Sequence, residues 1–403
     1  MSKVVVVGGG QAAASLVARL RSKGFDGQIT LIGEEPVPPY QRPPLSKAYL
    51  MGDMEEERLY LRPHSYYAEH DIDLHLNAHV SGIEPETKTV MAEGQAIAYD
   101  HLALCTGSVP RRLPAAIGGD LNGLYEVRTL KDVDAMCPSC VSGKKVLVVG
   151  GGYIGLEAAA VCAKLGLSVT LVEAADRILQ RVAAPETSAW FRDLHKSHGV
   201  DLREGTGLKQ LHGNDDGHVT QAELADGSLV DVDMVIVGVG IAPAQSLAES
   251  AGLEILNGIA VNTQGQTSDP SIWAAGDCAS FPHGEGRIRL ESVGNAVDMG
   301  ELVADNIMGA GRDYAAKPWF WSDQYDVKLQ IAGLNTGYDR VVVRTTGEAV
   351  SHWYYEGDKL LAVDAMNDGR AYMVGKRLID AGKSPDPDAV ANPDVELKAL
   401  LKA

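Results

Sequence analysis

The feature that most constrains this 403-residue chain is the stretch 144–173, which reads strand, glycine turn, helix, strand and acid. In dinucleotide-binding folds the first glycine of such a turn, here Gly150, makes a tight bend, and Gly152 lets the backbone approach a pyrophosphate. Gly155 lets the helix pack closely on the sheet. Glu173 ends the second strand, where a carboxylate accepts hydrogen bonds from both hydroxyls of an adenosine ribose. The stretch therefore predicts a dinucleotide site.

The same pattern occurs at the N-terminus of the chain. An apolar strand leads into a glycine run from Gly8 to Gly10, and Ala13 stands where the third glycine is usual, which close helix packing tolerates. The acid after the second strand is either Glu34 or Glu35. Two dinucleotide folds imply two dinucleotides, and a chain that binds two usually passes electrons between them.

Composition and charge exclude several other classes of protein. Lys and Arg number 36 against 54 Asp and Glu, and this net charge of −18 argues against nucleic acid or an anionic membrane as the main partner. No apolar run approaches the ~18 residues of a membrane span. We see no signal peptide before the first strand, and five scattered cysteines do not suggest a disulfide framework, so we expect a cytoplasmic protein.

The order of these patterns predicts three domains. The first nucleotide fold is expected at residues 1–110 and 245–318, and the second, at 111–244, is inserted into it. At residue 319 the sequence becomes aromatic and β-rich, which marks a third domain at 319–403. We therefore expect an α/β protein with two doubly wound, three-layer dinucleotide-binding domains and a small C-terminal α+β domain.

Three local expectations concern segments around these folds. After a proline-rich loop, Leu45 is expected to open a helix that continues through Leu50. Helices are expected to close the chain at 371–381 and 393–402. A small antiparallel meander is expected from the alternating segments at 74–76, 79–83, 89–91 and 95–98.

Motifs along almost the full length carry a resemblance to a known family. They are RPPLSK (42–47), GGGYIGLE (150–157), TSDPSIWAAGDCA (267–279), LESV (290–293) and PWFWSDQY (318–325). The chain resembles the FAD-dependent pyridine-nucleotide disulfide oxidoreductases, and within them the NADH-dependent, putidaredoxin-reductase-like ferredoxin reductases that serve bacterial cytochromes P450 or aromatic-ring dioxygenases. The resemblance implies glutathione-reductase-like nucleotide domains, FAD and NADH as cofactors, and a small [2Fe–2S] ferredoxin as partner of a ferredoxin–NAD(+) reductase.

The resemblance also places the site residues, and none of them is a metal ligand. The residues implied for FAD are Gly8, Gly10, Ala12, Ala13, Glu34, Lys47, Val80, Arg128, Asp277, Val293 and Trp321. Those implied for NADH are Gly150, Gly152, Tyr153, Ile154, Gly155 and Glu173. Catalytic roles fall to Lys47 beside the isoalloxazine, to Glu157 paired with it, and to Tyr153 over the nicotinamide site.

Several of these residues have plain alternative roles when taken alone. The plain role for Asp277 is a helix N-cap, which does not exclude ribitol binding, and the plain role for Glu157 is an acid on a helix surface. Tyr153 and Trp321 are residue types that more often pack in a core. For each of them the functional role depends on the resemblance.

Coenzyme choice has a direct physical basis in the sequence. Glu173 would repel a 2′-phosphate and accept a hydrogen bond from a free 2′-hydroxyl, which favours NADH over NADPH. Arg177 lies four residues further on and is the residue that would bind a phosphate instead.

The cysteine pattern distinguishes this chain from its disulfide-reducing relatives. No cysteine precedes Cys105, so the flavin must pass electrons directly to an outside acceptor. Cys137 and Cys140 have the spacing of a thioredoxin-reductase dithiol, but Val141 follows where those enzymes usually carry an acid, so we interpret both as loop thiols. Rubredoxin reductase remains the nearest enzymatic alternative, and a partner-binding protein resembling apoptosis-inducing factor the non-enzymatic one. We expect a monomer or weak dimer.

Overall fold

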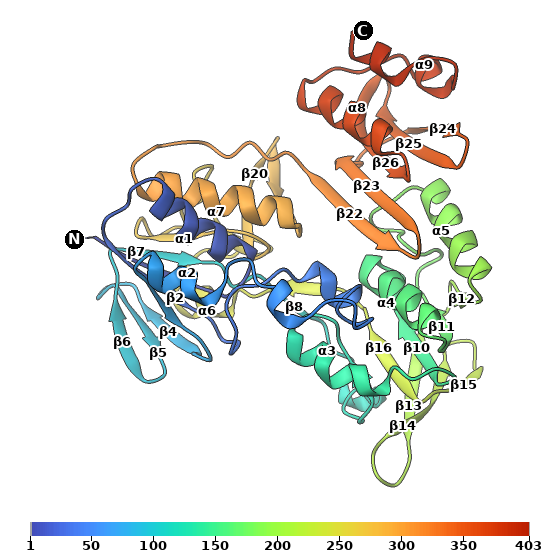
Figure 1. Cartoon of the computed structure of the whole chain (residues 1–403), viewed down its shortest axis with the longest axis horizontal. Helices are drawn as coiled ribbons and strands as arrows, with labels where there is room; N and C mark the ends of the chain where they lie inside the picture. Colours follow the sequence, from blue (N-terminus) through green and yellow to red (C-terminus); the bar gives the residue numbers. More distant parts are fainter. Residues whose placement is uncertain (1, 403) are drawn as a thin grey trace. The chain divides into compact units, whose positions relative to one another are not determined.

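The computed structural model describes residues 2–402, which form two compact units (Figure 1). The first unit contains residues 2–42, 55–109 and 241–318. The second contains residues 43–54, 110–240 and 319–402. The short segment 43–54 thus leaves the first nucleotide fold and packs with the second unit.

A five-stranded parallel sheet forms the centre of the first unit. Its strand order is β19-β7-β1-β2-β3. The strands are short, and all except the edge strand β3 are mostly apolar, because helices and loops cover both faces of a parallel sheet. The bounds are β1 Lys3–Val7, β2 Gln28–Ile32, β3 Ile72–His75, β7 His101–Leu104 and β19 Ile272–Ala274.

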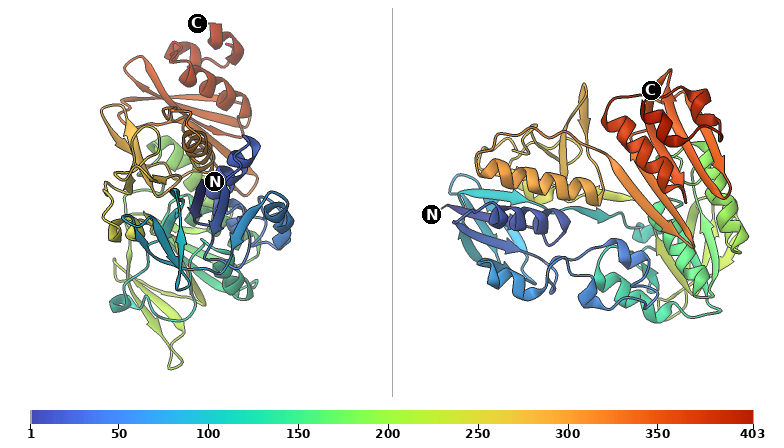
Figure 2. Two further views of the ribbon diagram at one scale, coloured as in Figure 1. Left: turned by 90° about the vertical axis from the view of Figure 1, so that its left-hand side faces the viewer. Right: turned by 45° about the horizontal axis from the view of Figure 1, so that its top comes forward.

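Helices α1 (Gln11–Ser22) and α7 (Val293–Ile307) pack against each other in the first unit (Figure 2). A Cβ added to Gly300 of α7 would lie 2.4 Å from the backbone oxygen of Ala12, so only glycine permits this approach. The Arg19 guanidinium donates to both carboxylate oxygens of Asp305, at 2.8 and 2.9 Å. These hydrogen bonds lower the pKa of Asp305 and fasten one helix to the other.

The antiparallel meander of the first unit has three strands, where four segments were expected. They are β4 Val80–Glu84, β5 Thr89–Ala92 and β6 Gln95–Ala98. The expectation was wrong for the segment at 74–76, because β3 pairs in parallel with β2. Smaller elements of this unit are α2 His64–Glu69, α6 Ser246–Ser250, β8 Ser108–Pro110, β17 Ile241–Pro243, β18 Ile259–Ala260, β20 Ala279–His283 and β21 Gly286–Ile288.

The second unit repeats the nucleotide fold and adds an antiparallel insert. Its parallel sheet has the order β12-β11-β10-β16-β9, and the insert has the order β13-β14-β15. The strands are β9 Leu124–Tyr125, β10 Lys145–Val149, β11 Ser168–Val172, β12 Asp201–Arg203, β13 Leu208–Gly213, β14 Val219–Leu224, β15 Leu229–Asp231 and β16 Met234–Val237. The helices are α3 Leu130–Met136, α4 Tyr153–Lys164 and α5 Pro185–Ser197.

A five-stranded antiparallel sheet follows residue 318 in the same unit, with helix α8 (Gly369–Asp380) packed on strands β23 and β26 (Figure 1). Its strands are β22 Trp319–Gln324, β23 Val327–Gly333, β24 Arg340–Thr346, β25 Ala349–Glu356 and β26 Lys359–Met366. The expected last helix was only partly correct. The chain instead forms α9 (Pro387–Ala391) and a 3₁₀ segment, Leu397–Lys402.

The segment after the proline-rich loop also differs from its expectation. Residues Pro43–Ser46 form one 3₁₀ turn, and no helix continues through Leu50. Two successive prolines provide no backbone N–H donors, which limits regular hydrogen bonding at this point.

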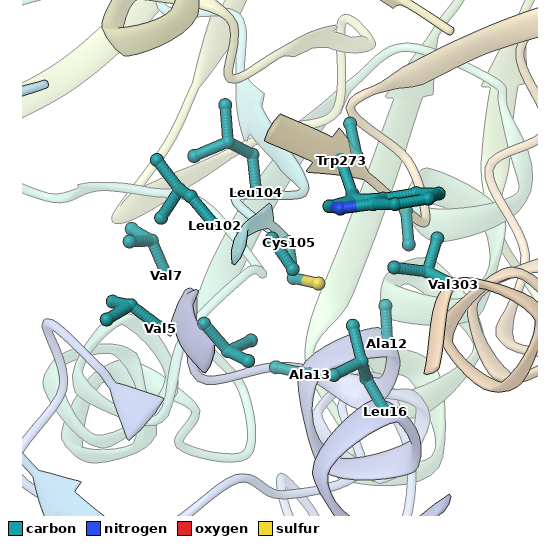
Figure 3. Close-up of a cluster of buried hydrophobic side chains, with 14 of the residues drawn as sticks. Val5, Val7, Ala12, Ala13, Leu16, Leu102, Leu104, Cys105, Trp273 and Val303 are labelled. Atoms are coloured by element: carbon teal, nitrogen blue, oxygen red, sulfur yellow. The ribbon is translucent and has the colours of Figure 1, made fainter. Parts of the chain in front are cut away.

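The core of the first unit forms where β1, β7 and β19 meet α1 and α7. Figure 3 shows Val5, Leu102 and Leu104 on the sheet side and Leu16 and Val303 on the helix side of this cluster. All five are at most 1% exposed. Burying side chains of this size stabilises the fold by roughly 1.5–3 kcal/mol each. Among residues 2–402, no helix is both long enough and apolar enough to cross a membrane.

Candidate functional site

The first glycine turn leaves the N-terminus of α1 open. Gly8 has φ +126°, and an added Cβ would lie 2.1 Å from the backbone oxygen of Cys105, so the turn requires glycine. Gly10 is the N-cap of α1 and provides no side-chain hydrogen bond, and nothing lies within 4 Å of a Cβ placed there. Ala12 and Ala13 are buried directly behind it. An uncapped helix N-terminus beside open space fits a pyrophosphate.

The two acids after β2 have different environments. Tyr40 and Arg42 donate to the Glu35 carboxylate at 2.6 and 2.7 Å, so this carboxylate is used within the protein. The Glu34 side chain is 79% exposed and lies 3.3 Å from His79 Nδ1. Of the two, Glu34 is therefore the acid available to a ribose.

Asp277 lies in the loop after β19 and is not a helix N-cap. Ser108 Oγ donates to its carboxylate at 2.8 Å. Helix α7 begins at Val293 and is capped instead by Ser292, whose hydroxyl accepts from the Asn295 N–H. The structure thus excludes the alternative role of Asp277 as a helix N-cap.

The second glycine turn has the same construction as the first. Gly150 has φ +106°, and an added Cβ would lie 2.4 Å from the backbone oxygen of Gly238. A Cβ on Gly155 would lie 2.0 Å from the Gly150 oxygen, so the start of α4 can pack this closely only without a side chain. Gly152 is the N-cap of α4, without a side-chain hydrogen bond and with open space around it.

Two backbone N–H groups hold the carboxylate of Glu173. Gly151 donates to Oε2 at 2.7 Å, and Ala175 donates to Oε1 at 2.8 Å. Each carboxylate oxygen retains a second lone pair, so the oriented group can still accept from ribose hydroxyls. Arg177 donates to Ser188 Oγ at 2.5 Å, which commits its guanidinium to an internal contact.

Lys47 and Glu157 form a buried ion pair in the second unit. The Lys47 ammonium donates to Glu157 Oε2 at 2.7 Å, and the side chains are only 17% and 3% exposed. Ser46 Oγ also donates to Oε2, at 2.6 Å, and Ser322 Oγ donates to Oε1 at 2.7 Å. Glu157 is therefore not an acid on the surface of α4. Its burial requires these donors, because an unpaired buried carboxylate is strongly unfavourable.

Aromatic side chains gather around the start of α4. The Tyr153 ring lies 4.8 Å from the Phe320 ring, and its hydroxyl is buried without a hydrogen-bond partner among the described residues. Burial raises the pKa of Tyr153 well above its ordinary value. Trp321 is half-buried and stacks on Trp319 at 5.5 Å, so it is not a core residue. Ile154 is 46% exposed on the first turn of α4.

The residues expected around FAD are distributed over both units. The first unit contains Gly8, Gly10, Ala12, Ala13, Glu34, Val80, Asp277 and Val293. The second contains Lys47, Arg128 and Trp321, together with every residue expected around NADH. Within residues 2–402, no cluster of His, Cys, Asp and Glu is arranged to hold a metal.

Comparisons with known proteins identify the family. The model of the pyridine nucleotide-disulphide oxidoreductases matches residues 2–300, and a reductase C-terminal model matches residues 319–401. This chain belongs to the pyridine nucleotide-disulphide oxidoreductase family. A ferredoxin–NAD(P)(+) reductase of Sphingomonas sp. is 44% identical over 99% of this chain and 97% of the relative. Putidaredoxin reductase of Pseudomonas putida is 40% identical over 99% and 97%.

The solved structures agree with the sequence comparisons. In the crystal structure of the covalent putidaredoxin reductase–putidaredoxin complex, the matching chain has a TM-score of 0.96 and 40% identity, with 100% of this chain and 98% of that chain covered. The predicted family, fold class and enzyme class, a flavin-dependent ferredoxin reductase, are thereby confirmed. The family uses FAD and NAD(P)H. The open N-terminus of α1 beside the Gly8 turn fits the pyrophosphate of FAD.

The family name refers to disulfide chemistry, but all five cysteines of this member are free thiols. Cys140 and Cys162 hydrogen-bond to each other, which lowers the pKa of Cys140 and raises that of Cys162. The hydrogen-bond partner of the Cys140 thiol is thus Cys162, a residue of α4 that the sequence did not single out.

Sequence reasoning missed part of the environment of Glu157. Ser46 and Ser322 both lie inside motifs quoted for the family, but neither was singled out. The only signal was their position within RPPLSK and PWFWSDQY. Nothing in the sequence indicated a role for Gln324 or His195, which extend the same network of hydrogen bonds.

Proposed function

We propose that this protein is an NADH-dependent reductase of a small [2Fe–2S] ferredoxin that supplies a cytochrome P450 or an aromatic-ring dioxygenase. When bound, FAD accepts both electrons of a hydride and releases them one at a time, as an iron–sulfur acceptor requires. The relatives, which include a ferredoxin–NAD(P)(+) reductase and a putidaredoxin reductase solved in complex with putidaredoxin, support a ferredoxin as partner. The choice of NADH rests on the Glu173 carboxylate, which two backbone N–H groups hold in a fixed orientation.

The coenzyme preference follows from charge and hydrogen-bonding capacity. Glu173 accepts from the 2′- and 3′-hydroxyls of the NADH ribose and repels the 2′-phosphate of NADPH. Arg177 does not compensate, because its guanidinium donates to Ser188 and to the backbone oxygen of Gln180. Gly150, Gly152 and the N-terminus of α4 bind the pyrophosphate.

Other residues hold FAD. In the first unit, the Gly8 turn and the N-terminus of α1 bind its pyrophosphate, Glu34 binds the ribose and Asp277 the ribitol. The backbone of Val80 contacts the adenine end. The remaining contacts are made by Gly10, Ala12, Ala13, Arg128, Val293 and Trp321.

Three residues of the second unit act on the reacting rings. Lys47 places a positive charge beside the isoalloxazine, where negative charge develops, and Glu157 fixes the position of that charge. Tyr153 covers the nicotinamide site until NADH enters. Its unpartnered buried hydroxyl supports such a movable role, because a buried donor without an acceptor is unfavourable where it stands.

The proposal assigns one task to each domain. Residues 1–110 and 245–318 bind FAD, residues 111–244 bind NADH, and residues 319–403 help to form the face that meets the ferredoxin. The enzyme acts in the cytoplasm as a monomer or weak dimer, where its free thiols stay reduced.

Anaerobic stopped-flow absorbance tests the electron acceptor. NADH should bleach the flavin, and an added [2Fe–2S] ferredoxin should reoxidise it in step with its own reduction. Faster reoxidation by rubredoxin would favour the rubredoxin reductase alternative. Bleaching that persists with either acceptor would favour a partner-binding protein.

Substitution of Glu173 tests the coenzyme choice. Glu173→Ala removes charged hydrogen bonds to the ribose, so the ratio of kcat/KM for NADH to that for NADPH should fall at least tenfold. Glu223→Ala is the matched control, because it removes a half-buried carboxylate, paired with Lys209, from the antiparallel insert of the same unit. An unchanged ratio in Glu173→Ala would overturn the assignment.

A further inference from the structure

A continuous chain of hydrogen bonds extends from Glu157 away from Lys47. Ser322 Oγ lies 2.7 Å from Glu157 Oε1, and Gln324 Nε2 lies 3.1 Å from Ser322 Oγ. Gln324 Oε1 lies 2.8 Å from His195 Nε2, and the Tyr325 hydroxyl lies 3.1 Å from His195 Nδ1. Four successive hydrogen bonds thus connect the carboxylate with a half-buried tyrosine.

The carboxylate determines the direction of every hydrogen bond in this chain. An ionised Glu157 can only accept, so Ser322 donates to it and has only acceptor capacity left for Gln324. The NH₂ group of Gln324 therefore faces Ser322, and its Oε1 faces His195. His195 must then carry its hydrogen on Nε2, which leaves Nδ1 to accept from the Tyr325 hydroxyl. All four donors point toward Glu157.

Burial makes this order obligatory. Ser322, Gln324 and His195 are each fully buried, and Glu157 is 2% exposed, so these three donors lack water as an alternative partner. Burial also lowers the pKa of His195 to about 4, and the neutral imidazole is the form whose Nδ1 can accept. A buried network in which every group is satisfied fixes one arrangement of its side chains.

The fold supplies the residues of the chain from three separate elements. Ser322 and Gln324 stand two residues apart on strand β22, so their side chains share one face. Glu157 comes from α4 and His195 from α5, both in the NADH-binding part of the same unit. Tyr325 occupies the turn after β22 with φ +57°, a strained conformation for a tyrosine.

The chemistry of the chain suits positioning rather than proton conduction. Hydroxyl and imidazole groups pass protons readily, because one atom can accept while another donates. The Gln324 amide lies in the middle of the chain and keeps separate donor and acceptor atoms. A chain interrupted by an amide orients its neighbours and does not carry protons along itself.

We infer that Ser322, Gln324 and His195 are positioning residues, which hold the Glu157 carboxylate in the one orientation that pairs with Lys47. The inference rests on the proposed role of the Lys47–Glu157 pair beside the flavin and nicotinamide. It assigns part of the C-terminal domain to the NADH half-reaction, in addition to its proposed part in meeting the ferredoxin.

Single-turnover reduction of the holoenzyme by NADH tests the inference. Ser322→Ala should lower the limiting rate of flavin bleaching about tenfold, the effect expected from one lost hydrogen bond to a charged group. Gln324→Leu removes only the support of Ser322 and should lower the rate by a smaller factor. The apparent Kd for NADH should change less than threefold. Ser351→Ala is the matched control, because Ser351 is equally buried on strand β25 but accepts a hydrogen bond from Trp353 and takes no part in the Glu157 network. The bleaching rate of this variant should equal that of the wild type.

A double-mutant cycle separates positioning from general loss of structure. If Ser322 acts through Glu157, then Ser322→Ala should have almost no effect on the bleaching rate in a Glu157→Gln background. Full additivity of the two substitutions would overturn the inference. Equal slowing by Ser351→Ala would overturn it as well, because that result would show a non-specific packing effect.

The ¹⁵N spectrum of the His195 imidazole provides a readout that does not depend on turnover. In selectively labelled holoenzyme at pH 7, the ring should be neutral with its hydrogen on Nε2, and His195→Gln identifies the signal. A hydrogen on Nδ1 would show that the chain runs the other way and would refute the proposal. A failed ferredoxin assay would instead refute the proposed function and leave this spectrum unchanged.

Discussion

The buried imidazole of His195 predicts a measurable dependence of stability on pH. Burial lowers its pKa from 6.5 to about 4, because the charged form loses its hydration inside the second unit. The unfolded chain therefore binds a proton below pH 6.5, and the native protein does not do so until about pH 4. The stabilisation is complete above pH 6.5 and is lost as the pH falls toward 4.

The size of this effect follows from the two pKa values. Between pH 7 and pH 5, His195 alone should reduce the free energy of unfolding by about 2 kcal/mol. The buried pair of His352 and Asp364 contributes less to the pH dependence of stability, because protonation of the two residues has opposite effects on the free energy of unfolding. Burial lowers the pKa of His352 to about 4, but it raises that of Asp364 to about 6. As the pH falls, protonation of Asp364 increases the free energy of unfolding over the same range in which His352 decreases it.

The substitution His195→Gln isolates the effect, because an amide is neutral at every pH. Urea unfolding of the holoenzyme, followed by far-ultraviolet circular dichroism at fixed FAD concentration, should be compared at pH 7 and pH 5. The difference in unfolding free energy between the two pH values should be about 2 kcal/mol smaller in His195→Gln than in the wild type. His64→Gln, which removes an exposed histidine of α2, should leave this difference as it is in the wild type. The reasoning is refuted if His195→Gln and wild type lose equal stability.

Two further predictions concern the first unit and the thiols. Gly300→Ala places a Cβ 2.4 Å from the backbone oxygen of Ala12, and overpacking of this kind costs about 1–3 kcal/mol. FAD affinity, measured by flavin fluorescence, should therefore fall at least fivefold. Gly286→Ala, with nothing within 4 Å, should bind FAD normally, and equal affinities would contradict the packing argument. Alkylation of Cys137 and Cys140 should leave NADH-driven ferredoxin reduction intact. Lost turnover would place these thiols on the electron path.

Sequence reasoning succeeded where the structure depends on local spacing. The second glycine turn and Glu173, the acid that follows β11, lie within about 25 residues of each other, and their geometry follows from the order of residues. Alternation at 74–76 indicated a strand but not its partner, and that strand joined the parallel sheet. Gln324 and His195 meet across 129 residues of sequence, so only the folded chain shows that they interact.

The pairing of α1 with α7 has a consequence for synthesis of the protein. Strands β1 and β7 are complete by residue 104, but β19 and α7, which finish their sheet and core, end only at residues 274 and 307. At about 5–20 residues per second, roughly 10–40 s pass before those segments leave the ribosome. During that interval the side of α1 that packs on α7 has no native cover. The nascent chain must therefore be protected from aggregation while the inserted NADH-binding domain is made, and flavin loading belongs to a late stage of folding.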